Sequence, residues 1–221
     1  MAFDSVQIAR LGGAWQAMGA LAASDGTVNH RWLQRLARTP EPLRDLADAA
    51  HYLCLLHGRH PGVVDFALDH AHLPGEHGWL ETAAEAFVTE RAYLVRLVAA
   101  AGPLPSTPGQ AEAEAAAAAQ RHALDMLAQS DRSGCASGAA FALALDWLAI
   151  RPVLDSAAER LGLTPPPCGL PLSEETVTVV DALAREPSVE RAMLFGAQQL
   201  FAQHRALFDL LEVRASARAH H

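Results

Sequence analysis

Five of the eleven histidines in this chain lie within one short segment, and they are the residues best suited to do chemistry. They are His57, His60, His70, His72 and His77. Imidazole is the commonest protein ligand for transition metals, and its unperturbed pKa lies close to neutral pH. The segment is typical of two helices joined by a tight turn at residues 58–62, where Pro61 and two glycines interrupt the helical pattern. The spacing therefore predicts a helical corner at which imidazoles gather.

Polar residues inside the apolar stripe of a helix are a second signal. Successive helical side chains turn by about 100°, so each predicted helix divides into an apolar and a polar face. Burying a charge is costly unless it is paired, so such residues must meet a partner, water, a metal or a ligand. Those predicted to lie in the interior are His57, His70, Arg91, Asp146, Glu190 and His204.

We hypothesise that His57, His70 and His204 are ligands or acid–base groups of an interior site. Such a site would hold iron or another transition metal, or a small-molecule ligand. Glu85 flanks the apolar stripe of its helix and is a further candidate ligand. The turn at 58–62 should make its two helices antiparallel neighbours. His57 and His70 are then expected to be largely buried, facing one cavity together with the helices over 77–100 and 188–213.

The same residues also have a purely structural interpretation. Arg91 and Asp146 would form a buried ion pair, and each histidine would donate to a helix carbonyl. Glu190 lies where a carboxylate stabilises the first turn of a helix. The protein would then be a non-enzymatic binding or interaction protein.

Two further patterns point to chemistry less directly. Asp48-x-x-His51 and Asp69-x-x-His72 have the spacing of metal-binding pairs, but Asp48 and Asp69 are predicted to point to solvent, as are Asp45 and Tyr52. Cys54 lies one helical turn before His57, where a Cys–His couple would activate a thiolate. A buried structural cysteine explains the same spacing.

Composition excludes several functions. All 17 basic residues are arginine, so a pyridoxal phosphate Schiff base and a P-loop lysine are excluded. The net charge of −8 disfavours nucleic acid as a partner. Three cysteines without C-x-x-C spacing, and a start that lacks a signal-peptide pattern, favour the cytoplasm. The longest apolar run, residues 136–150, contains Asp146 and is too short to span a membrane. The sequence leaves open whether the protein forms a homodimer.

Helical periodicity and an abundance of Ala and Leu predict an all-α, single-domain bundle over residues 1–221. A helix at about 134–161 is apolar nearly all round, so we place it at the centre of the bundle. Loops are expected near 102–106 and 162–172, a helix N-cap at Ser173, and a frayed tail at 214–221. About nine helices are predicted, near 3–23, 29–38, 40–57, 62–73, 77–100, 107–130, 134–161, after 173, and 188–213.

This arrangement resembles the heme-oxygenase-like and ferritin-like helical bundles. The resemblance is architectural: about 200 residues, long helices and polar groups that project inward, over most of the chain. It implies an interior site of the non-haem iron oxidase type. Ferritin-like iron sites use Glu-x-x-His, which does not occur in this sequence. No ligand is therefore transferred residue by residue from these families.

Overall fold

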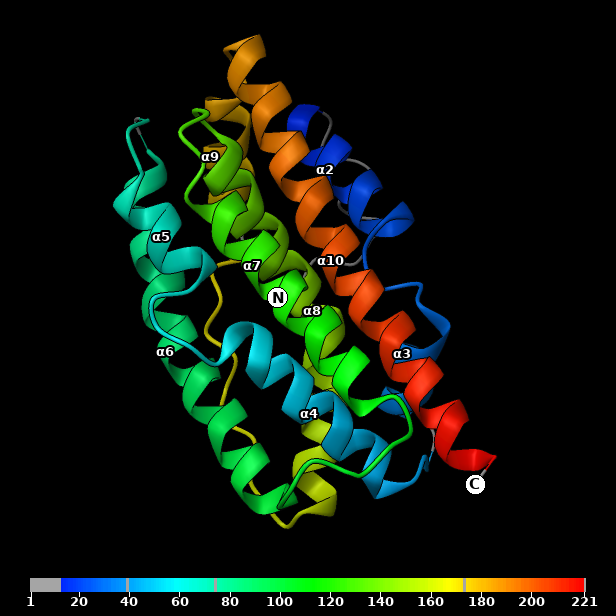
Figure 1. The fold of residues 1–221 in the computed structure, drawn as a ribbon. Helices are drawn as coiled ribbons and strands as arrows, with labels where there is room; N and C mark the ends of the chain where they lie inside the picture. Colours follow the sequence, from blue (N-terminus) through cyan, green and yellow to red (C-terminus); the bar gives the residue numbers. More distant parts are fainter. Residues whose placement is uncertain (1–12, 39, 74, 173, 221) are drawn as a thin grey trace.

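The computed structural model describes residues 13–38, 40–73, 75–172 and 174–220 (Figure 1). The described part of the chain contains helices and no strand, which confirms the all-α prediction. The helices are α2 (Gly13–Ser24), α3 (Arg31–Arg38), α4 (Leu43–His57), α5 (Val63–Asp69), α6 (Glu76–Ala101), α7 (Gln110–Ala128), α8 (Cys135–Arg160), α9 (Glu174–Leu183) and α10 (Pro187–Ala219).

Helix α8 forms the centre of the bundle, as its all-round apolar sequence predicts. It packs against α3, α4, α5, α6, α7 and α10, and buried residues occur on every side of it. Glycines bring α8 and α10 close together. A Cβ atom at Gly138 would lie 2.0 Å from the Met193 carbonyl oxygen, and one at Gly196 would lie 2.1 Å from the Cys135 carbonyl oxygen. No larger side chain fits at either position.

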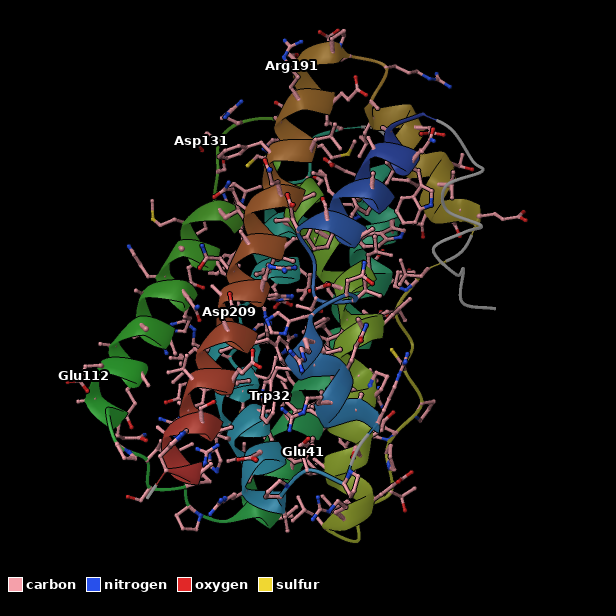
Figure 2. The ribbon with its side chains drawn as sticks, turned by 90° about the vertical axis from the view of Figure 1, so that its right-hand side faces the viewer. Trp32, Glu41, Glu112, Asp131, Arg191 and Asp209 are labelled. Carbon is pink, nitrogen blue, oxygen red and sulfur yellow. The ribbon has the colours of Figure 1, made fainter. Side chains whose placement is uncertain are left out.

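Four helices, α4, α6, α8 and α10, supply most of the buried polar groups. Helix α4 packs against α6, α8 and α10, and α6 packs against α8 (Figure 1). Helix α7 lies on one side of α10, and α2 and α3 lie on the other (Figure 2). Among the described residues, α8 is the one helix long and apolar enough to cross a membrane, but most of its apolar stretch is buried in the bundle.

Helix α5 is shorter than the sequence predicts, because it ends at Asp69 rather than near residue 73. Glu76 explains the early end. Its carboxylate accepts hydrogen bonds from the backbone N–H groups of His72 and Leu73, at 2.7 and 2.8 Å. These two bonds stabilise a turn in place of another turn of helix. The predicted start of the first helix and the predicted N-cap Ser173 lie outside the described residues.

The predicted frayed tail is wrong, because α10 continues to Ala219. Arg214 and Arg218 are buried on its inner side, where they form ion pairs with Asp48 and Asp45 of α4. The expectation that these two aspartates and Tyr52 face solvent is wrong for the same reason: Arg214 binds Asp48 and stacks on the Tyr52 ring. On α4 alone these side chains point away from the apolar face. In the folded protein they hold the end of α10 in place.

Candidate functional site

Three of the predicted interior residues meet in a line of hydrogen bonds. Asp146 Oδ2 lies 2.7 Å from His204 Nδ1, and His204 Nε2 lies 2.9 Å from His57 Nε2. Thr27, which sequence reasoning missed, completes the line through its backbone N–H and its hydroxyl, 2.9 and 3.0 Å from Asp146 Oδ1. We call these four residues the histidine line. His57 is 4% exposed, Asp146 is 2% exposed, and Thr27 and His204 are fully buried.

Each member of the histidine line comes from a different element. His57 is the last residue of α4, Asp146 lies in the middle of α8, and His204 lies in the middle of α10. Thr27 follows α2 in a turn that lies close to α8. A Cβ atom at Gly26 would lie 3.0 Å from Asp146 Oδ1, so a glycine lets this turn approach the carboxylate.

The hydrogen bonds define where protons lie in the histidine line. A carboxylate accepts, so the N–H of His204 is on Nδ1 and donates to Asp146. One proton must then lie between the two facing Nε2 atoms of His204 and His57. Burial lowers the pKa of His57 well below its usual value, and the neighbouring His204 lowers it further. The folded protein therefore keeps His57 neutral at neutral pH.

Aromatic rings surround His57, at one end of the histidine line. The His57 ring makes edge contacts with Trp147 and Phe87, with centroid distances of 5.6 and 6.4 Å. Low polarity around the imidazole is the reason that its charged form is disfavoured.

The low pKa of His57 predicts a loss of stability in mild acid. In the unfolded chain His57 has its ordinary pKa of about 6.5, so below that pH the unfolded state binds a proton that the folded state does not. The free energy of unfolding should therefore fall by up to roughly 2 kcal/mol between pH 7 and 5 on account of this residue. Urea unfolding across this range should give a shallower pH dependence for His57→Gln. Equal slopes for this variant and the wild type would refute the assignment.

Arg91 does not pair with Asp146, contrary to the sequence prediction. Its guanidinium binds Asp65 of α5 through two hydrogen bonds of 2.7 and 3.2 Å, and Asp65 also accepts the Gly62 N–H at 2.8 Å. Asp65 lies on the polar face of its own helix, but α6 packs directly against α5. Arg91 therefore joins α5 to α6 and takes no part in the histidine line.

The other candidates are dispersed. Glu85 is exposed, and Glu190 is partly exposed in the first turn of α10, so neither lies in the interior. His70 is half-buried at the end of α5 rather than largely buried beside His57, because the helix ends there. His60 and His72 are exposed, as predicted. Of the four proposed metal or ligand residues, only His57 and His204 meet.

Sequence reasoning also missed Glu90, which is fully buried. Its carboxylate accepts from Trp147 Nε1 at 2.9 Å and pairs with Arg151 at 2.6 Å, while burial raises the Glu90 pKa. Glu90 lies three residues after the buried Phe87 and four before the buried Leu94, so the helical spacing carried this signal.

Within the described ranges, no group of three or more His, Cys, Asp or Glu side chains is arranged to hold a metal ion. The two facing imidazoles of His57 and His204 are hydrogen-bonded to each other, and the carboxylate of Asp146 is already shared by His204 and Thr27. The sequence hypothesis of an interior transition-metal centre thus lacks a third donor in this part of the chain.

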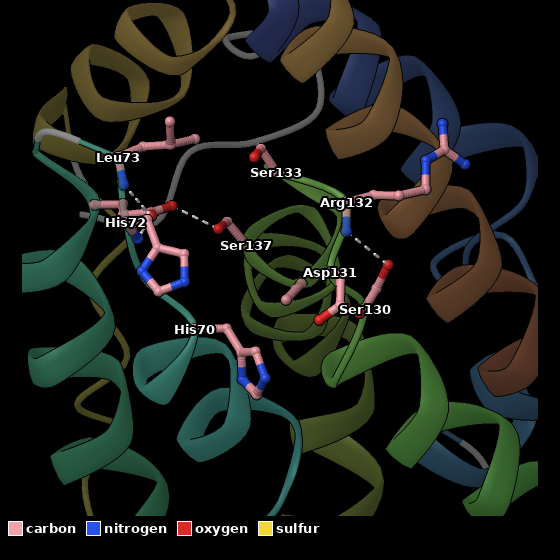
Figure 3. A pocket seen from close by; sticks show the side chains of 11 residues that line it. His70, His72, Leu73, Ser130, Asp131, Arg132, Ser133 and Ser137 are labelled. Carbon is pink, nitrogen blue, oxygen red and sulfur yellow. Dashed lines mark hydrogen bonds between the residues drawn. The ribbon is translucent and has the colours of Figure 1, made fainter.

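A separate polar cavity lies where α5 and α7 end and α6 and α8 begin (Figure 3). Its volume is about 80 Å³. We call it the polar cavity; its lining residues are His70, His72, Leu73, Glu76, Ser130, Asp131, Arg132, Ser133, Gly134, Ala136 and Ser137.

Two groups of the polar cavity are held in defined states. His70 Nδ1 lies 2.8 Å from the Phe66 carbonyl oxygen, which can only accept, so this nitrogen carries the proton and the neutral ring keeps its lone pair on Nε2. The buried Glu76 accepts from the Ser137 hydroxyl at 2.6 Å in addition to its two backbone bonds. Figure 3 shows the imidazoles of His70 and His72 beside this space, whereas Arg132 extends away from it.

Comparison with known proteins places the chain in one family. The model of a family of unknown function, DUF6975, matches residues 22–219. The chain belongs to this family. No curated protein and no solved structure matches it. The match includes every residue of the histidine line and of the polar cavity.

Proposed function

We propose that this protein binds a small molecule with an amino group in the polar cavity. The observation that carries the proposal is the lining itself: a half-enclosed space beside the His70 imidazole, the buried Glu76 carboxylate and three serine hydroxyls. The polar atoms of the histidine line are paired with one another inside the bundle, whereas the polar cavity leaves space for a ligand atom beside His70, whose Nδ1 is bonded to Phe66. A binding function is therefore better supported at the cavity than in the centre of the bundle.

The size of the polar cavity limits the ligand. A volume of about 80 Å³ is far below the several hundred Å³ of sites that hold cofactors or drug-sized molecules. A compound the size of glycine or ethanolamine fits this limit, and a haem or a nucleotide does not.

The charges around the cavity favour a cationic group. Glu76 and Asp131 are carboxylates, and His70 Nε2 presents a lone pair when the ring is neutral. The guanidinium of Arg132 is stacked on Phe195 instead, 5.3 Å from the ring centroid. An ammonium group would donate to the carboxylates and to His70, while the serine hydroxyls would bind the rest of the ligand.

The affinity of so small a ligand has an upper bound. The best small ligands gain about 1.5 kcal/mol per non-hydrogen atom, so about five atoms give at most about 7 kcal/mol, or a Kd near 10 μM. We therefore expect affinities between micromolar and millimolar.

A thermal-shift panel tests the proposal directly. Ethanolamine, glycinamide and glycine should raise the Tm of the protein, and acetate and phosphate of similar size should not. At a hundredfold excess over Kd, binding adds about 2.7 kcal/mol, which corresponds to a rise of roughly 5–10 °C for a chain of this length. The substitution His70→Ala should abolish the rise, and the exposed His60→Ala should preserve it. Equal shifts in these two variants, or none in the wild type, would contradict the proposal.

A metal-dependent oxidase at His57 and His204 has weaker support, because a third donor is lacking among the described residues. It stays a prediction from the sequence. Metal analysis and an absorption spectrum of protein purified without a histidine tag would decide it.

A further inference from the structure

We propose that two copies of this chain associate through the outer face of α10, antiparallel about a twofold axis. The face is a stripe of accessible residues, which we call the α10 stripe: Phe195, Gln199, Ala202, Ala206, Asp209 and Val213. It lies on the side of α10 turned away from α8, between α7 and α2 (Figure 2). This inference is independent of the polar cavity.

Apolar surface surrounds the N-terminal half of the α10 stripe. Phe195 is 43% exposed, and it lines two open grooves, one on each side of α10. The groove toward α2 has a volume of about 650 Å³ and is lined mainly by Ala17, Ala20, Leu21 and Leu194. The groove toward α7 contains Met126, which is 61% exposed. Contiguous apolar surface of this kind is typical of a protein interface.

The stripe is complementary to itself in the antiparallel direction. Its residues are separated by four, three, four, three and four positions, which is the heptad spacing of helices that pack side by side. Reversing one copy about the point between Leu200 and Phe201 places Phe195 over Ala206 of the partner subunit, and Gln199 over Ala202 of the partner subunit, so residues 195–206 face the same segment of the other copy. A large side chain thus lies opposite a small one at both symmetric positions.

The same alignment brings opposite charges together. Arg191 lies one helical turn before Phe195 and comes beside Asp209 of the partner subunit, and twofold symmetry repeats the pair. Both residues are exposed and lie along α10 in Figure 2. The Asp209 side chain is 65% exposed while it contacts His30 Nε2 at 3.0 Å, so part of the carboxylate stays accessible. Charge complementarity therefore selects the antiparallel register.

The length of the α10 stripe limits the area that a dimer can bury. The segment from Arg191 to Val213 is roughly 33 Å long at 1.5 Å per residue. A stable interface buries about 800 Å² on each partner, which requires the grooves beside Phe195 in addition to the helix itself. The partner's α10 would cover both grooves along its length.

Sedimentation velocity at increasing protein concentration tests the dimer. The wild type should be dimeric, and each charge reversal, Arg191→Asp or Asp209→Arg, should weaken association roughly tenfold, since two symmetric pairs become repulsive. The double variant should return to within about threefold of the wild type, because the pairs are restored with their signs exchanged. This rescue separates a lost contact from a misfolded chain.

A second substitution tests the packing. Ala206→Glu puts a charge against Phe195 of the partner subunit and should give a monomer with unchanged helical content. Ala99→Glu, at an alanine that is also exposed but lies on α6, should leave the dimer intact. A wild type that is monomeric at up to roughly 0.5 mM, or a dimer insensitive to Ala206→Glu, would overturn the proposal.

Discussion

Asp146→Ala is expected to lower the free energy of unfolding by about 3–5 kcal/mol, because it leaves three buried hydrogen-bond donors without an acceptor, at roughly 1–3 kcal/mol each. The carboxylate accepts three hydrogen bonds inside the bundle, one from His204 and two from Thr27. Without it, these donors stay buried with no acceptor, and each unpaired buried donor is costly. Urea unfolding at pH 7 measures the change.

Two variants sharpen the Asp146 result. Asp146→Asn keeps an oxygen for Thr27 but removes the charge that faces His204, so its loss should be smaller than that of Asp146→Ala. Asp69→Ala removes an exposed carboxylate from α5 and should change stability by no more than about 0.5 kcal/mol. A loss below about 1 kcal/mol for Asp146→Ala would show that the histidine line contributes little to the fold.

Asp48→Ala is expected to cost a similar amount, about 3–5 kcal/mol, and to release the end of α10. Asp48 accepts two hydrogen bonds of 2.8 Å from Arg214 and one of 2.8 Å from Arg218. All three side chains are buried, so the substitution leaves Arg214 without its counter-charge and Arg218 with Asp45 alone. Urea unfolding gives the energy, and amide hydrogen exchange over residues 211–219 reports the loosening.

The controls for Asp48 separate the ion pairs from general damage. Glu112→Ala, an exposed carboxylate on α7, should leave both readouts unchanged (Figure 2). The double variant Asp48→Ala with Arg214→Ala should lose less than the sum of the two single losses, because the residues share one interaction. If the last turns of α10 in Asp48→Ala keep the hydrogen-exchange protection of the wild type, this account of the chain end is contradicted.

The sequence by itself determined the helices and much of the interior. Helical periodicity is a local property, so the all-α class, the central place of α8 and the loops after α6 and α8 could be predicted. The apolar stripe of each helix also identified His57, Asp146 and His204 as interior groups, because a stripe marks the face that a helix buries. The position of Glu90 between Phe87 and Leu94 likewise places it on the buried face of α6.

Tertiary structure alone decided which of these groups meet. The contacts in question join residues far apart in the chain: 58 positions for His204 and Asp146, 147 for His57 and His204, and 166 for Arg214 and Asp48. A stripe shows which way a side chain points, but a partner is chosen by the rotation and axial offset of the neighbouring helix. Close contact at Gly138 and Gly196 sets that offset between α8 and α10, and this geometry pairs Asp146 with His204 rather than with Arg91.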